Sequence, residues 1–165
     1  MSVRRLNHAV LYIRDVDRAA AFYTDVLGFV TAHRIPGRAA FLRAPDSAND
    51  HDLGLFALGA QAPGPQRGGV GLYHLAWEVG TLGELAETAR RLTERGALVG
   101  SSDHRMSKSL YAKDPDSNEF EVMWRVPRED WPAGEDMGPR PLDLAAELAR
   151  WGADLRTGAA AGSAT

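Results

Sequence analysis

Two stretches of this chain decide its fold: LNHAVLYI at residues 6–13 and LYHLAWEV at residues 72–79. Both are rich in the apolar residues that strands favour, and each is expected to open one half of the chain as a strand over residues 5–13 or 72–79. His8 aligns with His74 at an offset of 66 residues (74 − 8). This alignment indicates an internal repeat.

The segments that follow the two stretches have the same order. At the same offset Asp15 aligns with Thr81, and both residue types suit the N-cap of a helix. Helices are expected over 16–26 and 81–95, ending at Gly28 and Gly96. Three strands should follow each helix, near 28–34, 38–43 and 51–58 in the first half and near 97–101, 107–112 and 118–126 in the second.

The sequence therefore predicts an α+β fold in which two βαβββ repeats form one module over residues 1–126. The halves span 4–59 and 72–126, and a Gly- and Pro-rich linker at 60–71 joins them. The C-terminal arm, 127–165, is expected to comprise a linker at 127–141, an amphipathic helix at 142–151 and a disordered tail. The helix is expected to cover a sheet edge or a dimer seam.

Composition excludes several classes of function. The 19 basic and 22 acidic residues give a formal net charge of −3, which provides no general attraction to nucleic acid or anionic lipid. No apolar run is long enough to cross a bilayer, and the start lacks the apolar core of a signal peptide, so a cytoplasmic location is expected. Because the chain has no cysteine, any metal must be held by His, Asp, Glu or backbone oxygens.

Three residues form a candidate metal site. His8 and His74 hold equivalent positions near the start of each half, and Glu121 lies on the last expected strand. A lone strand histidine is more often a structural residue, but the symmetric pair with a carboxylate favours a ligand set. Two imidazoles and one carboxylate leave coordination positions open, as in Fe(II) sites that bind substrate and O₂ together.

The chain also resembles a known family. LNHAVLYIRDVDRAAAFYTDVLGF at 6–29, GLYHLAWEV at 71–79 and DPDSNEFEVMW at 114–124 are similar to the vicinal oxygen chelate superfamily, which includes glyoxalase I, bleomycin-resistance proteins and extradiol dioxygenases. The family motif D-P-D-G-N-x-x-E ends on a metal-binding glutamate, which corresponds to Glu121. Ser117 replaces the motif glycine. The resemblance covers about residues 4–126 and implies a vicinal oxygen chelate module with a metal cleft.

Three further residues resemble those of type I extradiol ring-cleavage dioxygenases: His51, His104 and Tyr111. The resemblance implies that His51 moves a proton on the O₂ side of the site and that His104 and Tyr111 serve the substrate side. Without it, His51 and His104 would read as loop residues and Tyr111 as an ordinary strand aromatic. His104 and Tyr111 differ in strand parity, so both can face the site only if a bulge intervenes or His104 precedes the strand. His33 matches nothing in that family and is assigned to the surface.

The absence of a possible fourth metal ligand distinguishes this chain from glyoxalase I. Glyoxalase I has a fourth protein ligand in the first half, related by symmetry to the last glutamate. Subtracting 66 from 121 gives Leu55, and a slip of one residue gives Gly54. Neither side chain can bind a metal, so the site should be more open than a glyoxalase site.

The resulting prediction is an Fe(II)-dependent extradiol dioxygenase, catechol 2,3-dioxygenase-like, that cleaves a catechol-type ring with O₂. Mn(II) remains the alternative metal, and a homodimer is expected because a single module leaves sheet edges to cover. Two other functions stay open. One is a metal-free protein that sequesters an aromatic antibiotic, and the other is a metal-dependent isomerase, epimerase or lyase of the same superfamily.

Overall fold

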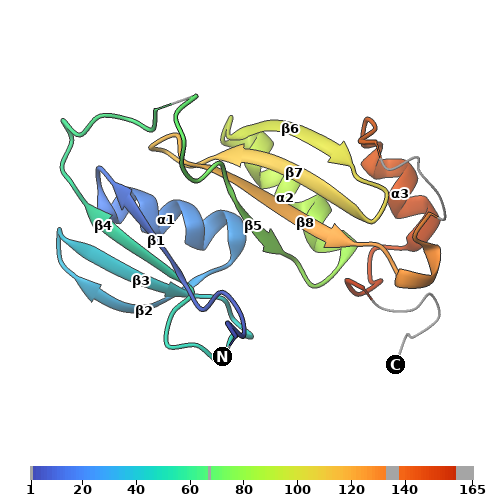
Figure 1. Cartoon of the computed structure of the whole chain (residues 1–165), viewed down its shortest axis with the longest axis horizontal. Helices are drawn as coiled ribbons and strands as arrows, with labels where there is room; N and C mark the ends of the chain where they lie inside the picture. Colours follow the sequence, from blue (N-terminus) through green and yellow to red (C-terminus); the bar gives the residue numbers. More distant parts are fainter. Residues whose placement is uncertain (1, 67, 133–137, 159–165) are drawn as a thin grey trace. The chain divides into compact units, whose positions relative to one another are not determined.

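The computed structural model describes residues 2–66, 68–132 and 138–158 (Figure 1). The chain divides into two compact units. The first contains Met1–Gly69 and Asp114–Asn118, and the second contains Val70–Lys113 and Glu119–Thr165. The five residues Asp114–Asn118 thus belong to the first unit, although the strands that precede and follow them belong to the second unit.

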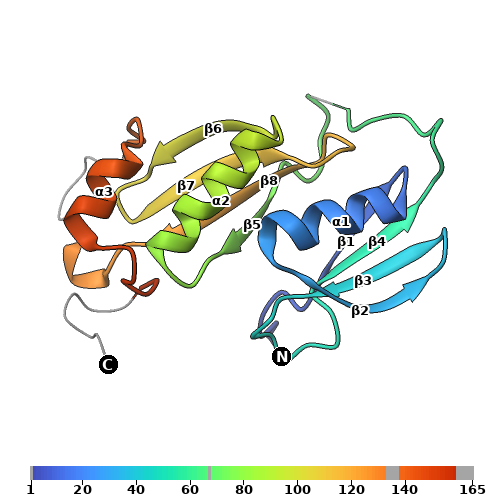
Figure 2. The same ribbon diagram turned by 180° about the vertical axis from the view of Figure 1, so that it is seen from behind.

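The first unit is a four-stranded sheet with one helix. Its elements, in order, are β1 (Ala9–Ile13), α1 (Val16–Leu27), β2 (Val30–Ile35), β3 (Ala39–Arg43) and β4 (Leu53–Ala57). The strand order is β1-β4-β3-β2; β1 is parallel to β4 and the other pairs are antiparallel. Helix α1 lies against one face of the sheet (Figure 2). Between them lies an apolar core that includes Ala40, Leu42, Leu53 and Leu55, all fully buried.

Local signals at both ends of α1 explain its bounds. The side chain of Asp15 accepts a hydrogen bond from the backbone N–H of Arg18, as an N-cap residue does. Gly28 ends the helix with φ of 71°, in the left-handed region that glycine enters without a steric penalty. Both predicted ends of this helix are confirmed within one residue.

The second unit repeats this topology. Its elements are β5 (Leu75–Glu78), α2 (Leu82–Glu94), β6 (Leu98–Asp103), β7 (Ser107–Lys113) and β8 (Glu119–Arg125), in strand order β5-β8-β7-β6. Thr81 and Glu84 form a reciprocal capping box at the start of α2. The predicted α+β fold with two βαβββ repeats is therefore confirmed.

The C-terminal arm packs against the second unit. It contains a short 3-10 helix (Arg128–Asp130) and α3 (Leu144–Trp151), where the sequence predicted a helix at 142–151. The indole Nε1 of buried Trp124 donates to the carbonyl of Leu155 at 3.0 Å. The buried Lys108 ammonium lies 2.7 Å from Asp103 and 3.1 Å from Glu147 of α3. The predicted disordered tail lies largely outside the described residues, which end at 158.

The three strands that were expected to contain site histidines begin later than the sequence predicts. β1, β4 and β5 start at Ala9, Leu53 and Leu75, so His8, His51 and His74 precede their strands instead of lying within them. In the first sheet the cause is the partner strand. Residues 44–52 fold into a loop around the carboxylate of Asp52, which accepts hydrogen bonds from Ala44 N and Ser47 Oγ. Because β4 begins only after this loop, residues 6–8 have no β4 residues opposite them to form a ladder.

Among the residues that the structure describes, no helix is long and apolar enough to span a membrane.

Candidate functional site

The second unit brings His74 and Glu121 together. Strand β8 alternates as predicted: Phe120, Val122 and Trp124 are buried towards the core, so Glu121 projects from the opposite face. The Nε2 atom of His74 lies 3.1 Å from Oε2 of Glu121. Both side chains are mostly buried, with exposed fractions of 23% and 13%.

This pair suits a divalent metal. Two adjacent ligands of an octahedral ion, with bonds of about 2.1 Å, lie about 3.0 Å apart, because the two bonds meet at a right angle. The separation of 3.1 Å between the nitrogen and the oxygen is close to that value. A neutral imidazole and a carboxylate are also part of the donor set that non-haem Fe(II) sites use.

A second pair lies beside the first on the neighbouring strand. Tyr111 of β7 is directly opposite Glu121 of β8 in the ladder, and its ring centre lies 5.8 Å from that of His74. The Tyr111 hydroxyl is 2.6 Å from Nε2 of His104. His104 stands between β6 and β7, before the strand begins, which is how two residues of different parity come to face each other.

The environment of Tyr111 keeps its hydroxyl protonated. Burial raises the pKa of Tyr111, and the negative charge of Glu121 raises it further. A phenol with a raised pKa can donate a hydrogen bond to an anionic oxygen at neutral pH.

The second unit holds four of the six predicted site residues in one cluster, namely His74, His104, Tyr111 and Glu121.

The first unit holds the other two, His8 and His51, side by side. Their ring centres are 4.5 Å apart. The Nδ1 atom of His51 lies 2.8 Å from a carboxylate oxygen of Asp50, and this hydrogen bond lowers the pKa of Asp50. The Nδ1 atom of His8 lies 2.9 Å from the side-chain oxygen of Asn7. In both rings Nδ1 is occupied, which leaves Nε2 for another partner.

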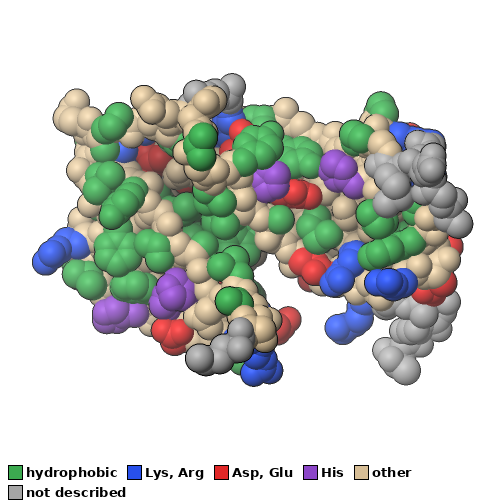
Figure 3. All heavy atoms as spheres, in the orientation of Figure 1, with side chains coloured by type: hydrophobic (Ala, Val, Ile, Leu, Met, Phe, Trp, Pro, Cys, Tyr) green, Lys and Arg blue, Asp and Glu red, His purple; other side chains and the backbone are tan. Residues whose placement is uncertain are grey.

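An aromatic surface extends from these histidines over the open face of the first sheet. The Phe41 ring packs edge-on against His51 at 5.1 Å and against Phe56 at 5.7 Å, and it stacks with His33 at 6.0 Å. Figure 3 shows hydrophobic side chains gathered over this sheet with imidazoles beside them. His33 is exposed, as predicted, but its stacking on Phe41 was not predicted.

The strand register decides which residue is equivalent to Glu121. Glu121 pairs with Ala76 of β5, and the residue equivalent to Ala76 at the offset of 66 is Val10, which pairs with Gly54. Leu55 faces the helix and is fully buried. Gly54 therefore occupies the position in the first unit that is equivalent to Glu121. A Cβ at Gly54 would lie 3.3 Å from Cγ2 of Val10, so the position is tightly packed as well as without a donor.

The turn Asp114–Asn118 has a structural role that sequence reasoning missed. The Asp114 carboxylate accepts hydrogen bonds from Tyr23 of α1, the backbone N–H of Asp116 and Asn118, and burial raises its pKa. Asp116 binds Arg14 and Arg18 at 3.0 and 2.6 Å. Ser117, which replaces the motif glycine, has φ of 72°. The bonds of Asp114 and Asp116 thus hold this turn within the first unit.

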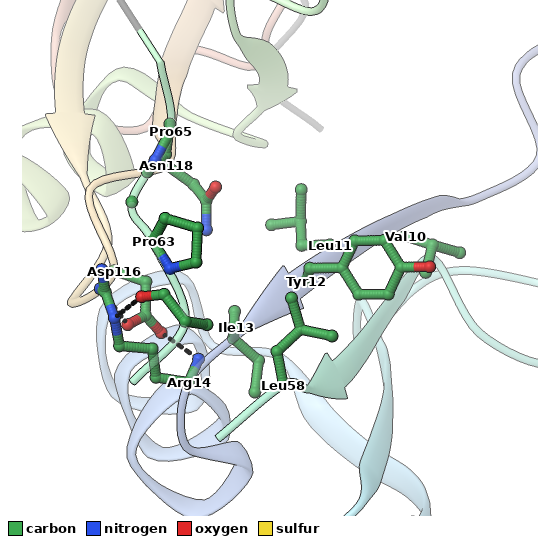
Figure 4. Close-up of a pocket in the computed structure, with 12 residues that line it drawn as sticks. Val10, Leu11, Tyr12, Ile13, Arg14, Leu58, Pro63, Pro65, Asp116 and Asn118 are labelled. Carbon is green, nitrogen blue, oxygen red and sulfur yellow. Dashed lines mark hydrogen bonds and ion pairs between the residues drawn. The ribbon is translucent and has the colours of Figure 1, made fainter. Parts of the chain in front are cut away.

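Beside this turn the first unit contains a cavity of about 330 Å³ (Figure 4). Its lining includes Tyr12, Leu58 and Pro63, with the Arg14–Asp116 pair at one side. None of the six predicted site residues lines it, so this cavity is not the candidate metal site.

Neither unit alone, over its described residues, brings together three His, Asp or Glu side chains that could hold a metal. The predicted ligand set draws on both units, with His74 and Glu121 from the second and His8 from the first.

Curated relatives of the chain include proteins named as dioxygenases. The Bacillus subtilis (strain 168) catechol-2,3-dioxygenase is 34% identical over 129 residues, which cover 76% of this chain and 43% of the relative. Metapyrocatechase 2 of Cupriavidus necator is 30% identical over 162 residues, 92% of this chain and 45% of the relative. Biphenyl-2,3-diol 1,2-dioxygenase 3 of Rhodococcus globerulus is 32% identical over 155 residues, 86% of this chain and 80% of the relative. The chain thus spans less than half the length of the first two.

Solved structures share the fold. A glyoxylase/bleomycin resistance protein/dioxygenase domain from Frankia sp. EAN1pec aligns with a TM-score of 0.60 and 22% identity, covering 76% of this chain and 94% of the other. A lactoylglutathione lyase from Agrobacterium tumefaciens aligns with a TM-score of 0.54 and 28% identity, covering 74% and 94%. The family model described as the Glyoxalase/Bleomycin resistance protein/Dioxygenase superfamily matches residues 5–122. This chain therefore belongs to that superfamily.

Proposed function

We propose that this chain is an Fe(II)-dependent extradiol dioxygenase that opens a catechol-type ring. The observation that carries the proposal is the cluster in the second unit, where the His74–Glu121 pair adjoins the Tyr111–His104 pair. A His–Glu pair at a separation that suits metal ligands, beside a phenol and an imidazole, fits a substrate that arrives with two acidic oxygens. Two relatives, named catechol-2,3-dioxygenase and biphenyl-2,3-diol 1,2-dioxygenase 3, support the same reaction class.

In this proposal His8, His74 and Glu121 hold the metal, and the remaining coordination positions are left to substrate and O₂. Bound Fe(II) would supply the redox chemistry that joins the catechol to O₂, with both oxygen atoms retained in the ring-opened product. Gly54 supports the three-ligand site because glycine, at the position equivalent to Glu121, has no side chain that could be a fourth ligand.

The other residues act on protons and charge. Tyr111 would donate a hydrogen bond from its hydroxyl to a substrate oxygen that has lost its proton. His104 would hold that hydroxyl in place through its 2.6 Å contact. His51 would move a proton through Nε2 while Asp50 holds Nδ1.

A lyase or isomerase is the second candidate, favoured by the 28% identity to a structure named as a lactoylglutathione lyase. Such an enzyme has no evident use for His51, His104 and Tyr111 together. Gly54 also departs from the four-ligand site of glyoxalase I.

The test is metal analysis of protein purified without oxygen, followed by a panel of catechols. We expect iron in the purified protein, oxygen uptake with at least one catechol, and a yellow ring-opened product. Iron-loaded protein that consumes no oxygen with any catechol would contradict the proposal and favour sequestration or a lyase reaction.

A further inference from the structure

We propose that Asn7 and Asn49 are positioning residues that present the Nε2 atom of His8 to the metal. This inference rests on the proposed metal site and concerns the segment before β1 and the loop before β4, both in the first unit. His8 precedes β1, so no ladder hydrogen bond holds it in the sheet. Its orientation depends instead on the side chains around it.

The orientation of the Asn49 amide is fixed by its neighbours. Its Nδ2 atom lies 2.8 Å from the backbone carbonyl of Asn7 and 2.7 Å from Oδ1 of Asp52. Both of these oxygens can only accept hydrogen bonds, so the nitrogen must face them. Its Oδ1 atom correspondingly lies 2.5 Å from the guanidinium of Arg5, which can only donate.

The orientation of the Asn7 amide follows from that of Asn49. The Oδ1 atom of Asn49 accepts a hydrogen bond, so the atom of Asn7 that lies 3.3 Å from it must be the Nδ2 donor. The Oδ1 atom of Asn7 then faces Nδ1 of His8 at 2.9 Å. An amide oxygen cannot donate. In the neutral imidazole the proton is therefore on Nδ1, and Nε2 keeps its lone pair.

That tautomer is the one a metal site needs here. A ligand imidazole binds metal through a free lone pair, and a partner on the other ring nitrogen fixes both the tautomer and the ring orientation. Residues in this supporting role typically contribute about 10–100-fold to metal affinity. Asn7 would supply this support to His8, while Nδ1 of His74 has no hydrogen-bond partner among the described residues.

Asn49 extends the support to a second ring. It joins the Asn7 backbone to the Asp52 carboxylate, and Asp52 organises the loop that carries His51. One asparagine therefore ties the segment of His8 to the loop of His51, whose rings lie 4.5 Å apart.

The first experiment reads the tautomer directly. Long-range proton–nitrogen NMR of the metal-free protein, in mildly alkaline buffer where imidazoles are neutral, should show His8 with its proton on Nδ1. Asn7→Leu, which has a similar size and no acceptor, should shift the population towards the other tautomer. Asn7→Asp keeps an acceptor oxygen for Nδ1 of His8 but loses the hydrogen bond to Oδ1 of Asn49, so it should recover the Nδ1–H tautomer at least in part. An unchanged tautomer in Asn7→Leu would overturn the inference.

The second experiment measures the affinity for Fe(II) alone under anaerobic conditions. Asn7→Leu should bind about 10–100-fold more weakly than wild type, and Asn7→Asp should regain at least part of that loss. Tyr73→Phe is the matched control, because it alters the residue before His74 but keeps the ring that lies 4.8 Å from that imidazole. Its affinity should equal that of wild type. If Asn7→Leu does not fold, Asn7→Ala takes its place.

The outcomes separate the two proposals. Wild-type protein that binds no Fe(II) would contradict the proposed function together with the metal role inferred for Asn7. Wild-type protein that binds Fe(II), with equal affinity in Asn7→Leu, would contradict this inference alone.

Discussion

At the scale of single residues, His51 separates an enzyme from a binding protein. Its imidazole is held by Asp50 and contacts His8 without being one of the proposed metal ligands. We expect His51→Phe to bind iron and catechol normally but to open the ring about 10²–10⁴-fold more slowly, the usual loss for a positioned proton-transfer group. The rate of ring opening should fall less in Tyr111→Phe, because this variant removes one hydrogen bond to a substrate that the metal would still hold.

The measurement is steady-state oxygen consumption, beside anaerobic titration of the same variants with the best catechol found. Unchanged turnover in His51→Phe would remove its catalytic role. Weakened anaerobic catechol binding in that variant would instead assign His51 to substrate binding.

Gly54 gives a second prediction at this scale. Gly54→Glu places a carboxylate at the position equivalent to Glu121, where it would compete with substrate or O₂ for the metal. We expect oxygen uptake to fall at least tenfold, on the order of one lost binding interaction, with iron still bound. Gly54→Ala is the control, because its Cβ meets Val10 at 3.3 Å but adds no donor. Equal losses in both variants would show that packing, and not ligation, limits this position.

At the scale of elements, the loop before β4 depends on a charged residue. Burial opposes ionisation of Asp52, but hydrogen bonds from Ala44, Ser47 and Asn49, together with the charge of Arg43, outweigh it and hold the pKa of Asp52 below its usual value. Its ionised form therefore stabilises the folded chain above the unfolded pKa of about 3.9. That contribution is lost as the pH falls through the lower folded pKa.

We expect Asp52→Asn to lower the free energy of unfolding by about 1 kcal/mol at neutral pH, with the gap to wild type closing below about pH 4. Urea unfolding at several pH values measures this, and Asp46→Asn, at an exposed carboxyl in the same loop, is the control. A gap that stays constant with pH would show that the charge of Asp52 does not stabilise the loop.

The C-terminal arm gives a prediction about stability, and not about chemistry. Truncation after about Arg128 removes the hydrogen-bond partner of the buried Trp124 indole and one of the two carboxylates beside the buried Lys108 ammonium, which keeps Asp103. We expect a lower melting temperature, with the loss of one such hydrogen bond contributing about 1–3 kcal/mol, and retained iron binding. A folded truncated protein without iron would mean that the arm contributes to the metal site.

The elements also show where sequence reasoning ends. The repeat, the two helix caps and the alternation of β8 were predictable because each is a local signal, carried by residues such as Asp15, Gly28 and Glu121. The late starts of β1 and β4 were not, because they depend on how the loop around Asp52 folds and on the hydrogen bond from Asn49 in that loop to the carbonyl of Asn7, 42 residues earlier in the chain. The hydrogen bonds of Asp114 and the stacking of His33 on Phe41 escaped prediction for the same reason.

At the scale of the whole molecule, the chain carries its candidate chemistry in two places. The second unit holds His74 and Glu121, while His8 lies in the first. The repeat gave the symmetry between His8 and His74, and the family motif gave Glu121. The proposed function requires these three residues to bind one metal ion.

Iron stoichiometry of anaerobically purified protein tests that claim most directly. Wild type should contain about one iron per chain, as three ligands for one ion require. His8→Ala, His74→Ala and Glu121→Ala should each lose it while keeping the circular dichroism spectrum of the folded chain. Full iron occupancy in all three variants would contradict the ligand set and the function built on it.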